Sequence, residues 1–184
     1  MMWNLPIEVE IDGEKHPIRN KCDYRVVLDT IICLMDNNLT EQEKAKGSLF
    51  IFYGENYNKI KDTNKAIKEM FKIIAYGEED GENENKPRLM DWEHDFKIIA
   101  PQISKNLGYS VRDDDNYTHW YDFIGAYLEL GECTFATVVS IRNKKAKGKK
   151  LENYEREFYK ENKKMVDLPQ KLTYEEQEWL DSDW

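Results

Sequence analysis

Three neighbouring polar residues have the spacing that a metal site could use. Asp91, His94 and Asp95 fall at positions i, i+3 and i+4 of the stretch DWEHD, so on a helix they would share one face. A metal site also needs a closed ligand set and supporting hydrogen bonds, which a local triplet does not supply. Acidic residues at the start of a helix are favoured by the helix dipole in any case. We therefore expect helix capping here, with no bound metal and no other cofactor.

A second polar pair could serve as a general base. His119 is followed one helical turn later by Asp122, which could orient the imidazole. A structural histidine with a local partner is the commoner arrangement, and we favour it. The chain also lacks Gly-x-Ser-x-Gly, Gly-x-x-x-x-Gly-Lys and Gly-x-Gly-x-x-Gly. The sequence therefore predicts a protein that is not an enzyme.

Charge is distributed unevenly along the chain. Five lysines lie between Lys144 and Lys150, whereas the whole protein has a formal net charge of -9. The lysine segment has no interleaved aromatic residue on which a base could stack. The net charge would repel a phosphate backbone, which argues against nucleic acid as a ligand. We expect the lysines to be solvated or paired with an acidic segment elsewhere.

Length and composition indicate one soluble domain with an appended tail, since the chain has 184 residues. Cys22, Cys33 and Cys133 have no paired spacing, which favours reduced thiols. No apolar run is long enough to span a bilayer, and no signal peptide is apparent, so we expect no membrane partner.

The secondary structure that the sequence predicts begins with a β-hairpin. Ile7, Val9 and Ile11 alternate with Glu8 and Glu10 and are followed by Asp12-Gly13, a strong signal for a tight turn. Helical periodicity and capping residues then replace the alternation. We expect helices over about 23–35, 40–54, 62–77 and 91–106, an acidic mobile loop at about 77–88, and a kink or break at Pro101.

The most aromatic stretch, YTHWYDFIGAYLEL, has the spacing of one helix face. It is followed almost at once by a further amphipathic segment, CTFATVVSIRNKK, which predicts an antiparallel helix pair. We interpret the aromatic face as a packing seam rather than the wall of an active site. Its expected members are Trp92, Trp120, Phe123, Ile124, Tyr127, Leu128 and Phe135.

These elements predict a mainly α fold. A hairpin plus helical body would cover residues 1–141, and a charged helical extension with an acidic aromatic tail would cover 142–184. Four apolar residues of that tail would be costly to leave in water, so we expect them to dock on the body, on a sister subunit or on a partner, with docking on the body favoured. These candidate contact residues are Leu172, Trp179, Leu180 and Trp184.

The order of segments resembles a tailed-phage protein family named after gene product fifteen of phages that infect Gram-positive bacteria. The hairpin, the stretch MDWEHDFKIIAPQISKNLGYSV, HWYDFIGAYLELG and TFATVVSIR carry the resemblance. Its most specific parts are Asp91-Trp92-Glu93, His119-Trp120 and Ser140-Ile141-Arg142, whereas Pro101 and Lys105 depart from the family pattern.

Genes of that family typically lie between those for the tail tube and the tape measure. The resemblance therefore implies a non-catalytic tail assembly chaperone that coats the tape measure protein, with tail tube subunits and second copies of the chain as further partners. It would act in the cytoplasm of the infected host and be absent from the mature virion. The alternative is a structural virion protein, such as a tail-completion or connector subunit.

Overall fold

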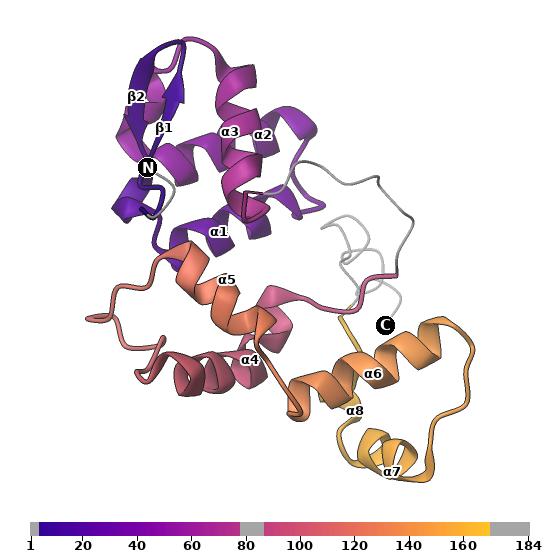
Figure 1. Ribbon diagram of the computed structural model, residues 1–184. Coiled ribbons are helices and arrows are strands. Elements are labelled where there is room, and N and C mark those ends of the chain that lie inside the picture. Colours follow the sequence, from indigo (N-terminus) through magenta and orange to yellow (C-terminus); the bar gives the residue numbers. More distant parts are fainter. Residues whose placement is uncertain (1–3, 78–86, 170–184) are drawn as a thin grey trace. The chain divides into compact units, whose positions relative to one another are not determined.

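The computed structural model describes residues 4–77 and 87–169, which are mainly helical (Figure 1). The predicted mainly α fold with one N-terminal hairpin is confirmed. The described residues form two compact units, the first from 4–77 with 118–122 and the second from 87–117 with 123–169. Most of the expected acidic loop, residues 78–86, and the tail from 170 onward lie outside the described residues.

The first unit begins with the predicted hairpin, β1 Glu8–Ile11 paired antiparallel with β2 Glu14–Pro17. Asp12 and Gly13 form the turn with φ of 53° and 82°. Two positive φ angles give the turn a twist that matches the strands, which is why Asp-Gly is favoured there. Val9 and Ile11 are buried, whereas Glu8 and Glu10 face solvent. The alternation in the sequence thus gives the hairpin one buried face.

Three consecutive residues without a glycine adopt left-handed backbone conformations directly after the hairpin. Asn20, Lys21 and Cys22 have φ of 49°, 56° and 63°. Each such residue costs roughly 1–2 kcal/mol, so the turn is stable only if its surroundings fix it. Two backbone hydrogen bonds to the segment around residue 119 fix this turn. The Trp120 amide donates to the Cys22 carbonyl at 2.9 Å, and the Tyr24 amide donates to the Thr118 carbonyl at 2.9 Å.

The helices of the first unit begin at the predicted caps. α1 (Tyr24–Leu34) follows Asp23, α2 (Glu41–Tyr53) follows a capping box of Thr40 and Glu43, and α3 (Thr63–Ile74) follows Asp62. A short 3-10 helix links α2 to α3. The core contains fully buried residues from all three helices: Val27, Phe52, Tyr53, Ala66 and Met70. The Tyr53 hydroxyl donates to the Ala66 carbonyl at 2.9 Å, so its polar end is satisfied inside that core.

The second unit begins with α4 (Trp92–Leu107), which continues through Pro101. The expected break at this proline is therefore absent, and a kink there stays a prediction. Proline has no amide hydrogen to donate to the carbonyl four residues earlier, which is that of Lys97. The Arg112 guanidinium supplies the missing donor, since its Nη2 lies 2.9 Å from the Lys97 oxygen. A side chain from beyond the end of the helix thus satisfies the acceptor that the proline leaves.

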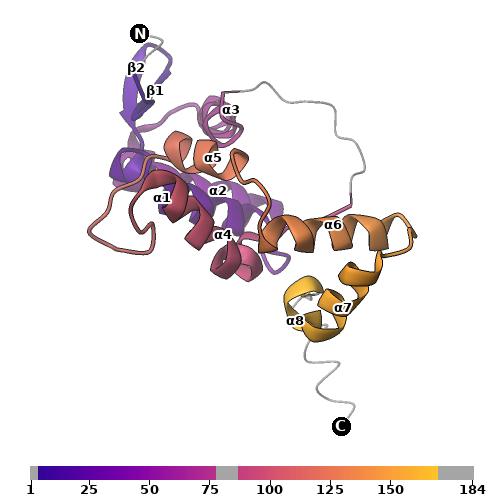
Figure 2. The same cartoon turned by 60° about the horizontal axis from the view of Figure 1, so that its bottom comes forward.

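The chain then forms α5 (Trp120–Leu128), α6 (Thr134–Ala146), α7 (Asn153–Glu161) and α8 (Lys163–Val166). α7 and α8 lie beside each other against α6, in the orange and yellow part of Figure 2. Val138, Ile141 and Val166 form their shared buried core. The predicted boundary at Arg142 falls inside α6, so the charged extension begins within a helix of this unit.

Candidate functional site

The three residues considered for metal binding serve other purposes. The Asp91 side chain caps α4 by accepting from the His94 amide at 2.9 Å. His94 Nε2 lies 3.1 Å from the Met165 carbonyl oxygen, and Asp95 faces Arg142. In the described part of the chain no group of three or more His, Cys, Asp or Glu residues could hold a metal ion. The triplet is a helix start with two long-range contacts.

Arg142 of α6 is the centre of the hydrogen-bond network in the second unit. Two of its N–H groups donate to the Asp95 carboxylate, at 2.6 and 2.8 Å. The other three donate to the carbonyl oxygens of Leu89 at 3.0 Å, Met165 at 3.0 Å and Val166 at 2.6 Å. A guanidinium has five N–H donors, so all of them are used. Arg142 and Asp95 are buried, and this full set of partners offsets the cost of placing two charges inside the unit.

A second buried carboxylate joins α6 to α7. Glu155 accepts from Lys144 Nζ at 2.8 Å, from the Glu152 amide at 2.8 Å and from the Ser140 hydroxyl at 3.2 Å. Burial acts to raise the pKa of the Glu155 carboxyl, but these hydrogen bonds outweigh it, and the pKa lies below its ordinary value. Ser140 and Lys144 therefore support the fold here.

His119 is fully buried in the first unit, and its partners differ from the expected one. Its Nδ1 accepts from the Tyr121 amide at 3.0 Å, so Nε2 carries the hydrogen and donates to the Pro6 carbonyl at 3.0 Å. Asp122 is exposed. Both ring nitrogens are occupied by backbone groups, which is the arrangement of a structural histidine.

The predicted packing seam is divided between the two units. In the second unit the ring centroids of Trp92 and Tyr127 are 5.1 Å apart, and those of Tyr127 and Phe135 are 5.9 Å apart. Phe123 is fully buried and lies 6.0 Å from Trp92, and Ile124 is half-buried. In the first unit Trp120 is buried, with its indole Nε1 3.0 Å from the Ile73 carbonyl oxygen.

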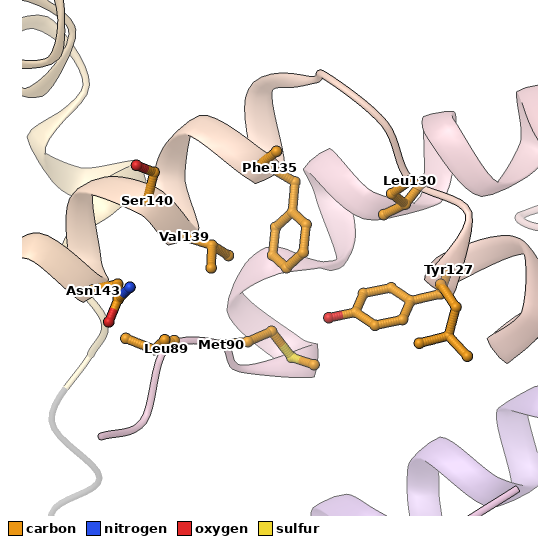
Figure 3. A pocket seen from close by; sticks show the side chains of 10 residues that line it. Leu89, Met90, Tyr127, Leu130, Phe135, Val139, Ser140 and Asn143 are labelled. Atoms are coloured by element: carbon orange, nitrogen blue, oxygen red, sulfur yellow. The ribbon is translucent and has the colours of Figure 1, made fainter. Parts of the chain in front are cut away.

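Leu128 has a different position from the rest of the expected seam, since its side chain is 63% exposed. It lies at the edge of an open groove of about 550 Å³ in the second unit. Figure 3 shows Phe135 and Val139 pointing from α6 toward Met90. We call this feature the α6 groove; its lining is Leu89, Met90, Tyr127, Leu128, Leu130, Phe135, Ala136, Val139, Ser140 and Asn143. Most of these side chains are apolar, so the groove suits an apolar segment better than a charged substrate.

Comparison with protein families gives a match to the bacteriophage Gp15 protein model over residues 1–168. The chain belongs to the bacteriophage Gp15 protein family. Comparison with curated proteins and with solved structures gave no match.

The residues that carried the resemblance to the Gp15 family now have structural roles. Asp91 caps α4, Trp92 packs on Tyr127, His119 and Trp120 anchor the backbone of the first unit, and Arg142 holds the network of the second. Periodicity in the sequence identified the aromatic residues. It could not identify the Arg142 network, because its partners come from segments far apart in the chain.

Three further expectations concern the partners of this Gp15 protein. Within 4–77 and 87–169, no helix is long and apolar enough to cross a membrane. The lysines at 147, 149 and 150 are exposed, whereas Lys144 and Lys145 contact acidic side chains. The candidate partner-contact residues Leu172, Trp179, Leu180 and Trp184 all lie outside the described residues.

Proposed function

We propose that this Gp15 protein is a non-catalytic tail assembly chaperone that binds the tape measure protein and keeps it soluble during tail assembly. The α6 groove is the observation that carries this proposal. A tape measure is a long helical chain with an apolar stripe, and an apolar helix side fits a groove lined by residues such as Phe135 and Val139.

The electrostatics of the chain support the same role. A formal net charge of -9 keeps a complex with an apolar partner dispersed, because like-charged particles repel each other. The groove is open, so a helix bound in it would stay partly exposed and make modest contacts. Polymerising tail tube subunits would have to displace the chaperone from the tape measure. Modest contacts allow this release more readily than a very tight interface does. The protein would then act in the cytoplasm of the infected host and leave before the virion is complete.

Co-expression with the tape measure protein of the same phage tests the proposal. The chaperone should move the tape measure from the pellet into the soluble fraction, and Ala136→Asp should abolish this effect, since it places a charge in the groove. Thr134→Asp is the matched control because it places the same charge on α6 outside the groove. The proposal is wrong if the unmodified chain leaves the tape measure insoluble, or if both variants behave alike.

Mass spectrometry of purified virions separates this role from the structural alternative. A chaperone should be absent from the particles, whereas a tail-completion or connector subunit should remain at a fixed copy number. Retention of this chain in the virion would replace the chaperone proposal with the structural one.

A further inference from the structure

The α6 groove is elongated in the direction of α6. Figure 3 shows Tyr127 and Leu130 at one end of the groove and Asn143 at the other. Ala136 and Asn143 both line the groove and are seven residues apart on α6, which is about 10 Å of helix at 1.5 Å per residue. This part of the groove therefore matches about two turns of a second helix that lies along α6.

The Asn143 end of the groove is basic. Lys147 follows Asn143 by four residues and so continues the face of α6 that lines the groove. The Lys149 amide donates to the Lys144 carbonyl at 2.8 Å, which keeps the next lysines beside the end of the helix. Lys147, Lys149 and Lys150 are exposed and form no ion pair within the described part of the chain. Three ammonium groups are thus available to a ligand at this end.

The opposite end of the groove is acidic. Leu128 and Leu130 line the groove there, and the neighbouring Glu129 and Glu132 are exposed. Neither glutamate has an ion-pair partner among the described residues. A ligand that lies along α6 therefore meets carboxylates at one end and ammonium groups at the other.

A helix has the same asymmetry of charge in its own structure. Acidic residues are favoured in its first turn and basic residues in its last turn, because they complement the helix dipole. Such a helix complements both ends of the groove only if its first turn lies at Lys147 and its last turn at Glu129. It then runs antiparallel to α6, and this direction also pairs the positive end of each helix dipole with the negative end of the other.

We propose that the α6 groove selects a segment of the tape measure protein that forms an amphipathic helix antiparallel to α6. The segment has acidic residues at its start, an apolar stripe of about two turns and basic residues at its end. The inference rests on the proposed function, because it takes the tape measure protein as the ligand of the groove. Since the tape measure chain has one direction, every bound copy of this protein would point the same way along it.

Two synthetic peptides and the full-length chain test this direction. Both peptides have the same composition and the same leucine stripe at i, i+3, i+4 and i+7. One has glutamates in its first turn and lysines in its last, and in the other these are exchanged. We expect the unmodified chain to bind the glutamate-first peptide at least about tenfold more tightly, which is the size expected for several exposed ion pairs together. Fluorescence anisotropy of the labelled peptides measures both Kd values.

Charge reversal in the protein separates the contact from the helicity of the peptides themselves. The triple variant Lys147→Glu, Lys149→Glu and Lys150→Glu should remove or reverse the preference, whereas the helicity of each peptide stays the same. The matched control carries the same change of charge at three exposed lysines of α7 and α8, and should keep the preference. These control residues are Lys160, Lys163 and Lys164. If the triple glutamate variant does not fold, glutamine at the same three positions should reduce the preference.

A charge inside the groove distinguishes the failure of this inference from that of the proposed function. Ala136→Asp should abolish the binding of both peptides. If it does, but the unmodified chain binds both peptides equally or the control variant loses the preference as well, the direction is wrong and the groove is still a helix site. If neither peptide binds, or if Ala136→Asp leaves binding unchanged, the groove is not a helix site, and the proposed function loses the observation that carries it.

Discussion

Asp95 and Arg142 are 47 residues apart in the chain and form a two-bond ion pair in the interior of the second unit. The pair joins α4 to α6. Arg142 additionally binds the Leu89 carbonyl before α4 and the Met165 and Val166 carbonyls in α8. One guanidinium thus connects α4, α6 and α8 with the segment before α4, and both α6 and that segment line the α6 groove.

Removing either member of this pair should destabilise the protein strongly, but not equally. Asp95→Ala leaves a buried charge without its counter-ion, which costs about 3–5 kcal/mol. Arg142→Ala leaves the Asp95 carboxylate without its counter-ion and also removes the Arg142 donors from three carbonyl oxygens, so we expect a loss at or above the top of that range. Urea unfolding monitored by circular dichroism measures both. A loss below about 1 kcal/mol for either variant would show that the pair is solvated.

Acid should weaken the contact between α6 and α7. The folded pKa of Glu155 lies below its ordinary value, so this carboxylate contributes stability above its unfolded pKa of about 4.3, and the contribution is lost as pH falls through the folded pKa. Stability measured from pH 7 to pH 3 should therefore fall less steeply for Glu155→Gln than for the unmodified chain. Glu157→Gln on the exposed surface of α7 is the control. Parallel pH profiles for the three proteins would contradict the assignment.

Trp120 should be essential for the first unit. Its indole is buried and donates to the Ile73 carbonyl, so Trp120→Ala loses both packing and a hydrogen bond and should cost about 3–5 kcal/mol. Trp120→Phe keeps most of the ring volume and should cost less. Chemical unfolding of both variants tests this order, and an unchanged midpoint for Trp120→Ala would show that the indole does not support the fold.

Elements that depend on local chemistry could be predicted from the sequence. The Asp12-Gly13 turn and the caps at Asp23, Thr40 and Asp62 need only neighbouring residues. The left-handed turn at Asn20 to Cys22 could not be predicted, because it contains no glycine and is fixed by backbone groups at Thr118 and Trp120. Local signals thus defined the elements, whereas long-range contacts defined how they are held.

Prediction of the candidate site from the sequence has the same limit. Helical spacing found Trp92, Phe123 and Tyr127, which do contact one another. It also assigned Leu128 to the seam, although this side chain lies at the open groove, since a periodic pattern cannot distinguish a buried position from the rim of a surface hollow. Leu89 and Met90 also line the groove. They precede α4 and belong to no periodic pattern in the sequence, so helical spacing could not identify them.

The continuity of α4 at Pro101 supports a last prediction, on a pair of residues that the sequence does not connect. Arg112→Ala should cost about 1 kcal/mol, because it removes the donor to the Lys97 carbonyl that Pro101 cannot serve. Pro101→Ala restores an amide at that position and should stabilise α4. In the Pro101→Ala background Arg112→Ala should then cost less, since the Lys97 carbonyl accepts from residue 101 instead. A double-mutant cycle by urea unfolding measures this coupling. Additive effects of the two substitutions would mean that Arg112 does not compensate for the proline.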